Sequence, residues 1–300
     1  MSGLTLALDI GGTKIAVALV DAAGDLRYRA QRPTPHADAE GFWAQVEALI
    51  GDALAAAGCP VGGVGVASAG PIDVTEGTIS PLNITALHQF PIVQRIERRT
   101  GLPVRLAGDV VCLAMGEHWR GAGRGARFLL GMVVSTGIGG GLVLDGLPYG
   151  GRTGNAGHVG HIVVQADGPP CACGGQGCVE AIASGPHLVR WAQQHGWGGP
   201  DADAKALAAA AAAGDEVAIS AFARGADAIA AAIASAAAVC DLDLVVLGGG
   251  VANAGEVLFD PLRVRLAHYA RLSFLRGLAV VPAALGGDAG LVGAAALFRS

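Results

Sequence analysis

The sequence predicts an α/β protein built from two lobes around a central cleft. The main observation is that one plan occurs twice, in "LALDIGGTKIAVALVDAAG" near the N-terminus and in "VSTGIGGGLVLDG" from Val134 to Gly146. Each stretch is an apolar run, a glycine-rich turn and a second apolar run, which is typical of a β-hairpin. The chain has 300 residues, more than one hydrophobic core usually organises. We therefore expect two related lobes, each opening with a hairpin whose tip reaches into the cleft.

After its hairpin, Leu4–Val20, the first half of the chain continues in the order helix then strand. Phe42–Ala57 has apolar residues at three- and four-residue spacing and predicts a helix. "GGVGVASAGPID" then indicates a strand and a loop, and "PIVQRIERRTG" indicates a short amphipathic helix ended by glycine. "LPVRLAGDVVCLAMGEHWRG" predicts a strand that runs into a helix around Asp109.

The second half repeats this order. Its hairpin spans roughly Phe128–Leu147, and an alanine-rich helical region is expected at Ala202–Val239. "LDLVVLGGGVA" predicts a strand and a glycine loop, and "GDAGLVGAAALF" predicts a closing helix. The two hairpin turns lie about 128 residues apart, from Gly12 to Gly140, which is the size of one small domain. An internal duplication explains this spacing.

Composition argues against two classes of partner. The formal net charge is -5 and charged residues make up 15% of the chain, which does not suit a protein that binds a nucleic-acid backbone. Mean hydropathy is +0.49, but charges such as Asp215 and Arg224 interrupt the alanine-rich stretches, so we expect no membrane span. The first residues do not follow the pattern of a secretory signal. We therefore expect a cytoplasmic protein that binds neither nucleic acid nor membrane.

Three glycine loops, "DIGGTK", "STGIGGG" and "GGGVA", predict a nucleotide site. Glycine lets the backbone come close to a ligand, so that several N–H groups can converge on phosphate oxygens. Neither a P-loop nor a Rossmann motif fits, because the glycines after Asp9 lead into a strand-like run. Asp9 is suited to hold Mg²⁺ through water, and Thr13 and Thr136 to donate to phosphate oxygens. The simpler alternative is that these turns only connect hairpins.

One histidine and three cysteines predict a metal site: His161, Cys171, Cys173 and Cys178. The glycines between them let one loop fold around an ion. Three thiolates and one imidazole complete a tetrahedral zinc ion with no open position, so we expect this zinc to be structural. Unconnected, reduced cysteines are the alternative. The other cysteines are single, and we interpret them as small core residues: Cys59, Cys112 and Cys240.

Asp109 is the candidate catalytic base. It stands where an apolar strand gives way to a helix in "RLAGDVVCLAMGE". A carboxylate within reach of a substrate hydroxyl can take its proton as phosphate arrives, which typically contributes about 10²–10⁴ in rate. The alternative role is a helix N-cap, which aspartate fills readily.

The motifs "DIGGTK", "ASAGPID", "STGIGGG" and "CACGGQGCVEAIASG", in this order, resemble the ROK family (repressors, open reading frames and kinases) over essentially the whole chain. The resemblance implies an actin-like, hexokinase-type fold, in which two α/β lobes close over a sugar and Mg-ATP. We expect residues 1–118 plus 286–300 to form the smaller lobe and 119–285 the larger one, which carries the zinc loop. ROK repressors have an additional N-terminal winged helix. Because this chain starts at its first hairpin, the resemblance favours a kinase, which would form a homodimer or homotetramer.

The resemblance also implies roles for single residues, with Asp109 as the catalytic base. The phosphate loops match Asp9, Gly11, Gly12, Thr13 and Lys14 in the first hairpin and Ser135, Thr136, Gly137 and Gly139 in the second. The loop on the adenosine side matches Gly248, Gly249 and Gly250. The sugar contacts match Gly70, Asn83, Gly108, Asp109, His158, His161 and Glu180. His161 would then bind zinc and also face the sugar.

Two positions depart from the family pattern. Gly108 stands where the family usually has an asparagine that contacts a sugar hydroxyl, and His158 stands where it usually has the glutamate of G-E-x-G-H. A histidine at this place resembles some bacterial N-acetylmannosamine kinases. A neutral imidazole accommodates an N-acetyl group, or an altered C2 group, with which a carboxylate would form different contacts.

Together these features predict an ATP-dependent sugar kinase that phosphorylates the 6-hydroxyl of N-acetylmannosamine or a related hexose. Glucose is the alternative substrate, a cyclitol or unusual sugar is compatible, and polyphosphate is an alternative phosphate donor. A different class of protein, a sugar-binding sensor that has lost catalysis, would explain Gly108 and His158. A nucleotide-dependent dehydrogenase is disfavoured, since no acidic ribose partner follows at the Rossmann spacing.

Overall fold

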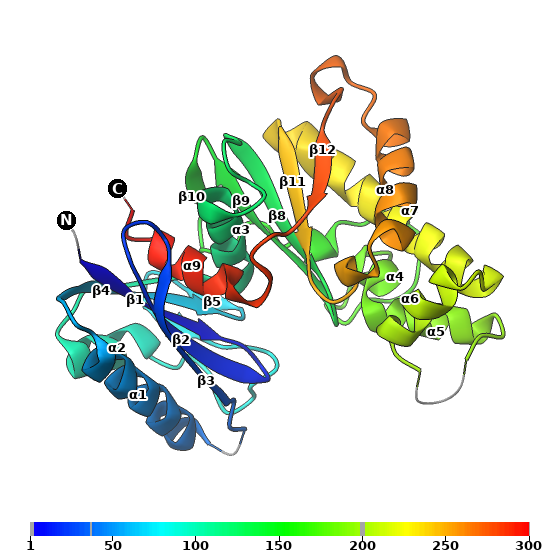
Figure 1. The fold of residues 1–300 in the computed structure, drawn as a ribbon. Coiled ribbons are helices and arrows are strands. Elements are labelled where there is room, and N and C mark those ends of the chain that lie inside the picture. Colours follow the sequence, from blue (N-terminus) through cyan, green and yellow to red (C-terminus); the bar gives the residue numbers. More distant parts are fainter. Residues whose placement is uncertain (1–2, 37, 199–201, 300) are drawn as a thin grey trace. The chain divides into compact units, whose positions relative to one another are not determined.

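The computed structural model describes residues 3–36, 38–198 and 202–299 (Figure 1). They divide into two compact units. Unit 1 comprises the described parts of Met1–Gly125, Gly141–Ala156 and Ala284–Ser300, and unit 2 comprises those of Ala126–Gly140 and Gly157–Ala283. The outermost residues of the predicted smaller lobe, 1–2 and 300, lie outside the described residues.

Unit 1 is built on a five-stranded sheet of order β3-β2-β1-β4-β7. β1 and β2 form the predicted first hairpin and pair antiparallel, whereas β4 runs parallel to both β1 and β7. The strands are β1 (Leu4–Ile10), β2 (Lys14–Val20), β3 (Leu26–Pro33), β4 (Val61–Ser68) and β7 (Val104–Gly108), with a small ribbon of β5 (Ile72–Asp73) and β6 (Thr78–Ile79). The helices are α1 (Ala39–Ala56), α2 (Ile92–Thr100), α3 (Asp109–Arg120), the short η4 (Gly286–Asp288) and α9 (Ala289–Ala296).

The two faces of this sheet carry side chains of different size. Successive side chains of a strand point to opposite faces. Large apolar side chains such as Leu8 pack with α1 and α2 in one core. The alanines of β1, β2 and β4 pack with α3 and α9 in another, beside Cys112 and Leu291. Asp9 follows Ala7 by two residues, so its side chain lies on the α3 and α9 face.

The second sheet has the order β10-β9-β8-β11-β12, and β8 and β12 both run parallel to β11. Its strands are β8 (Phe128–Val134), β9 (Ile138–Leu144), β10 (Leu147–Tyr149), β11 (Leu244–Gly248) and β12 (Ala279–Pro282). β8, β11, β12 and the start of β9 belong to unit 2, whereas β9 from Gly141 onward and β10 belong to unit 1. The helices of unit 2 are η1 (Val159–His161), α4 (Glu180–Ala183), α5 (Gly185–Gln194), α6 (Ala204–Ala212), α7 (Glu216–Cys240), η2 (Ala252–Ala254), α8 (Glu256–Tyr269) and η3 (Ser273–Leu275). The long helices α7 and α8 lie side by side (Figure 1).

The mixture of sheets and helices confirms the predicted α/β class, with local differences. The alanine-rich region predicted as one helical stretch is two helices, because Gly214 has φ +94° and Asp215 caps α7 by accepting a hydrogen bond from Ala218 N at 2.8 Å. Cys59 is exposed in the turn before β4, so its prediction as a core residue is wrong, whereas Cys112 is buried. Cys240 is half-buried.

Within the described part of the chain, α7 alone has the length and apolar composition of a membrane-spanning helix. In its apolar stretch 56% of the residues are buried inside the protein. It packs against α8 and contacts α4, α5 and α6. A helix at the centre of a soluble core has these same properties, so α7 is weak evidence for a membrane span.

Candidate active site

The parallel strands of unit 1 bring several predicted site residues to one edge of the sheet. The register pairs Asp9 with Ala67 across β1 and β4, and Ser68 with Gly108 across β4 and β7. Asp109 follows directly as the first residue of α3. Gly70 follows the end of β4, where Ala69 N donates to Ile10 O at 3.0 Å. Open α/β sheets bind their ligands at the carboxyl ends of their strands, which is this edge.

Asp109 does not cap its helix, so the alternative role weighed for it is wrong. Gly108 occupies the N-cap position of α3. The Oδ1 atom of Asp109 instead accepts a hydrogen bond from Val110 N at 2.8 Å. Burial raises the pKa of Asp109, and hydrogen bonds from backbone N–H groups oppose this rise. The raised pKa makes Asp109 a stronger base than an exposed aspartate.

Asp9 is a second carboxylate of raised pKa at the same edge. Burial, followed by the Asp109 carboxylate, raises the pKa of Asp9 to about 6, and the Lys14 ammonium lowers it. The first turn of α9 lies against this carboxylate, since a Cβ atom at Gly290 would be 2.7 Å from Asp9 Oδ2. Carboxylate oxygens are the ligands that Mg²⁺ prefers. Asp9 is therefore suited to its predicted role of holding Mg²⁺ through water.

The tip of the first hairpin is held by hydrogen bonds and lies beside Asn83. Gly11 N donates to Lys14 O at 3.0 Å. The buried Thr34 donates its hydroxyl to Gly11 O at 2.7 Å and its N–H to Thr13 O at 3.1 Å. A Cβ atom at Gly12 would be 2.2 Å from Asn83 Nδ2, so a side chain there would displace the Asn83 amide. The structure thus joins a predicted phosphate loop to a predicted sugar contact.

In unit 2 the other two predicted glycine loops meet. Ser135 N donates to Gly137 O at 2.8 Å, and Ser135 O accepts from Gly185 N at 2.8 Å. Gly249 has φ +97°, and a Cβ atom there would be 2.4 Å from Val134 O, so its backbone lies against the end of β8. Gly248 ends β11, and Gly139 lies within β9. These loops therefore lie together beside the start of α5.

A cavity of about 550 Å³ opens between these loops and the first turns of α5 and α6. Its lining includes three predicted residues, Ser135, Thr136 and Gly250. Pockets of this volume accommodate small organic ligands. The polar side chains that the sequence reasoning missed are Arg190, Gln193, Asp203 and Lys205. The amphipathic segment "GPHLVRWAQQ", with proline in its first turn, is the signal that would have found α5.

His158 and Glu180 lie close to the second glycine loop. The Oε2 atom of Glu180 accepts a hydrogen bond from Ile138 N at 2.8 Å. The rings of His158 and His161 are stacked, with centroids 6.2 Å apart and planes 13° apart. Partial burial and then His161 lower the pKa of His158, whereas Glu180 raises it. His158 is therefore disposed to be neutral, and it shares this region with two other predicted sugar contacts.

The predicted metal ligands come together as expected. One ligand atom from each of His161, Cys171, Cys173 and Cys178 lies within 4.8 Å of the others. Gly174 has φ +88° and turns the chain between the cysteines, with its N–H donating to Cys171 O at 3.0 Å. Burial and the neighbouring thiols raise the pKa of Cys178 to about 12. Cys178 would lose its proton on binding a metal ion, and this donor set of three sulfur atoms and one imidazole fits tetrahedral zinc.

The predicted site residues thus form two groups, each within one unit. Unit 1 holds Asp9, Gly11, Gly12, Thr13, Lys14, Gly70, Asn83, Gly108 and Asp109, and unit 2 holds Ser135, Thr136, Gly137, Gly139, His158, Glu180, the three loop glycines at 248–250 and the metal ligands.

A family model described as "ROK family" matches residues 5–300. The chain belongs to the ROK family. This ROK protein is 35% identical to a glucokinase of Thermotoga maritima, over 98% of this chain and 96% of the relative. It is 38% identical to an N-acetylmannosamine kinase of Shigella boydii, over 98% of this chain and 97% of the relative.

Among solved structures, the protein resembles a ROK family glucokinase from Streptomyces griseus in complex with glucose and AMPPNP. The two are 36% identical, the TM-score is 0.82, and the match covers 99% of each chain. This similarity confirms the predicted fold, the actin-like, hexokinase-type fold of the ROK family.

Proposed function

We propose that this ROK protein is an ATP-dependent sugar kinase, which transfers the γ-phosphate to the 6-hydroxyl of a hexose or N-acetylhexosamine. The observation that carries the proposal is the position of Asp109, a carboxylate of raised pKa at the carboxyl edge of the sheet, beside Asp9. The relatives named glucokinase and N-acetylmannosamine kinase support it, as does the similarity to a glucokinase with glucose and AMPPNP bound.

In this reaction Asp109 acts as the general base. Its carboxylate accepts the proton of the sugar hydroxyl while the hydroxyl oxygen bonds to the γ-phosphorus, and the bond from that phosphorus to the bridging oxygen of ADP breaks. Lys14 donates to phosphate oxygens, and its charge offsets theirs. Mg²⁺ brought with ATP would be held by Asp9 through water and would neutralise charge that develops on the phosphates.

The unit 2 cavity is our candidate for the nucleoside end of ATP. Its volume suits a nucleoside, and glycine backbone with hydroxyls of Ser135 and Thr136 lies at one side of it. The N–H groups and hydroxyls of that side can donate to phosphate oxygens. Arg190, Asp203 and Lys205 would then surround the base and ribose.

N-acetylmannosamine is the substrate that we favour, and glucose is the alternative. His158 supports this choice, because an imidazole of lowered pKa stays neutral and can donate or accept a hydrogen bond beside an N-acetyl group. Gly108 provides no side-chain hydrogen bond to a sugar hydroxyl, which supports a substrate other than an ordinary hexose.

The zinc ion that fits His161 and the three cysteines would be structural. Val179 N donates to Ile162 O at 3.0 Å directly after Cys178, and Glu180 follows as the first residue of α4. A metal bound at this loop would therefore fix both the His158 side and the Glu180 side of the sugar contacts.

We also propose that the protein is a cytosolic homodimer or homotetramer. Exposed apolar side chains on α8 and just after it support self-association: Val264, Leu272 and Phe274. Light scattering coupled to size exclusion measures the number of chains directly.

The test of the function is ADP release with Mg-ATP and a panel of sugars: N-acetylmannosamine, glucose, mannose, N-acetylglucosamine, fructose and a cyclitol. Asp109→Asn runs beside the wild type. We expect turnover on one sugar and a loss of about 10²–10⁴ in kcat in the variant. If folded protein binds a sugar saturably but releases no ADP, the result would support the sensor instead. Activity with polyphosphate but not with ATP would show that polyphosphate is the phosphate donor.

A further inference from the structure

Glu117 is a buried carboxylate that has no role in the proposed reaction. It lies on α3, eight residues after Asp109, and its relative exposure is 0%. Its oxygens accept hydrogen bonds from Ala122 N at 2.8 Å, from Ala284 N at 3.0 and 3.1 Å, and from Leu285 N at 2.8 Å. A buried carboxylate is costly unless it is hydrogen-bonded in this way. Glu117 therefore holds backbone from two segments that are distant in the sequence.

Both segments lie next to points where the chain passes between the units. The chain first leaves unit 1 after Gly125, shortly beyond Ala122, and it returns for the last time at Ala284, while residues 141–156 also belong to unit 1. One carboxylate on the helix that begins with Asp109 thus binds backbone beside the first and the last of these passages.

The returning segment leads directly to the phosphate-side residues. After Leu285 the chain forms η4 and then α9. A Cβ atom at Gly287 would lie 3.8 Å from Lys14 Nζ, and one at Gly290 would lie 2.7 Å from Asp9 Oδ2. Residues 284–290 therefore run from the Glu117 carboxylate to Asp9 and Lys14.

α9 and α3 are in backbone contact, so neither moves alone. A Cβ atom at Gly116 would lie 2.3 Å from Ala289 O, and one at Gly293 would lie 1.6 Å from Cys112 O. Displacement of the segment bound by Glu117 would therefore shift the first turn of α9, which lies against Asp9.

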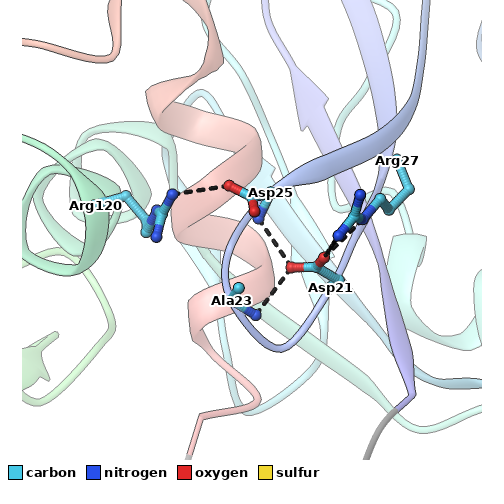
Figure 2. A network of polar contacts seen from close by, with 5 residues as sticks. All are labelled: Asp21, Ala23, Asp25, Arg27 and Arg120. Carbon is cyan, nitrogen blue, oxygen red and sulfur yellow. Dashed lines mark hydrogen bonds and ion pairs between the residues drawn. The ribbon is translucent and has the colours of Figure 1, made fainter.

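Two ion pairs of this region lie at the surface. Figure 2 shows Arg120, at the end of α3, bound to Asp25 at a distance of 2.8 Å. In the same turn, Asp21 Oδ1 accepts hydrogen bonds from Ala23 N and Asp25 N. Arg29 binds Asp288 at 2.8 Å, with both side chains more than a third exposed. Exposed ion pairs of this kind contribute little to the stability of the fold. Glu117, in contrast, is a buried side chain, and its hydrogen bonds tie Ala284 and Leu285 to α3.

We propose that Glu117 is a positioning residue: through residues 284–290 it holds the Asp9 carboxylate and the Lys14 ammonium in place for phosphate transfer. This proposal rests on the proposed kinase function. A shift of about 1 Å in a reacting group can cost about 10²-fold in rate, so a defect here acts on the chemical step.

The test compares kcat and sugar KM in Glu117→Gln, Glu117→Ala and a control, Asp38→Ala. Gln keeps one acceptor oxygen and places an NH₂ group against N–H donors, so it retains only part of the contacts. Asp38 likewise accepts a backbone hydrogen bond, from Gly41 N at 2.6 Å, but it caps α1. We expect kcat to fall about tenfold in the Gln variant and up to about 10²-fold in the Ala variant, with sugar KM changed less than about threefold.

A double-mutant cycle with Asp9→Asn separates positioning from loss of stability. If Glu117 acts through Asp9, Glu117→Gln lowers kcat by a much smaller factor in the Asp9→Asn background than in the wild type. Equal losses in both backgrounds, or an unchanged kcat in Glu117→Gln, would overturn the positioning role while the kinase stands. A wild type that releases no ADP with any sugar of the panel would instead overturn the proposed function, and the positioning role with it.

Discussion

The carboxylates of Asp9 and Asp109 interact at the carboxyl ends of the parallel strands of one mixed sheet. Burial and then the Asp109 charge raise the pKa of Asp9 to about 6, and Lys14 opposes this rise. The register of β1, β4 and β7 creates the pair, because it aligns the carboxyl ends of three strands. A neighbouring negative charge disfavours ionisation of a carboxylate, and a neighbouring cation favours it. For Asp9 the cation is the Lys14 ammonium.

The first prediction concerns the pH dependence of the rate. Asp9 must be ionised to hold Mg²⁺, so kcat/KM should increase as the pH rises through about 6 and then level off. Lys14→Met removes the cation that lowers this pKa, so its acid limb should move to higher pH. Rates measured from about pH 5 to about pH 8 with saturating Mg²⁺ test this. A flat profile across that range would contradict the assignment of Asp9.

The second prediction concerns stability. The pKa of Asp9 is raised from 3.8 to about 6 on folding, so the folded state binds more protons than the unfolded state between these values. Stability from this group is therefore lost as the pH rises through the window and is lowest above it. Asp9→Asn should raise Tm at pH 7, and the gain should shrink as the pH falls below about 6.

Thermal melts at two pH values measure this effect. Asp38→Asn is the matched control, because asparagine caps a helix about as well as aspartate, and its Tm should change little at either pH. A lower Tm in Asp9→Asn at pH 7 would show that the ionised carboxylate stabilises the fold.

Local chemistry made much of the site predictable. The first hairpin, the strand and helix around Asp109, and the cluster of His161 with three cysteines follow from patterns within a few residues of each other. The role of residues 284–290 does not, because it depends on the contact of α9 with Asp9 and of Glu117 with Leu285. The periodicity of apolar residues in the sequence does not predict such long-range contacts. α5 was missed although its amphipathic pattern and the proline in its first turn are local signals, whereas the cavity beside it depends on residues distant in the sequence.

The third prediction concerns zinc. Purified protein should contain about one zinc ion per chain, and Cys173→Ser should lose it, because three ligands remain where structural sites need four. We expect a lower Tm and a higher sugar KM in this variant, since the loop also fixes Glu180. Cys59→Ser is the control, as Cys59 is an exposed cysteine outside the cluster. Elemental analysis that finds no zinc in the wild type would exclude this metal.

The fourth prediction concerns the nucleotide cavity. Ala204 lines it at the start of α6, so Ala204→Leu should fill space needed by the nucleoside and raise the KM for ATP about tenfold, with sugar KM unchanged. Ala209→Leu makes the same change on an exposed face of the same helix and should leave both constants unchanged. Equal effects of the two variants would place the nucleoside elsewhere.

The fifth prediction concerns sugar choice. His158→Glu replaces a near-neutral imidazole, stacked on His161, with a carboxylate that accepts hydrogen bonds but does not donate them. We expect kcat/KM to fall for N-acetylmannosamine and to rise for glucose, so that the ratio of the two changes by about tenfold or more. His88→Glu adds the same charge at an exposed histidine of unit 1 and should leave the ratio unchanged. If both sugars lose activity equally in His158→Glu, His158 supports the zinc loop and the contact that selects the sugar lies elsewhere.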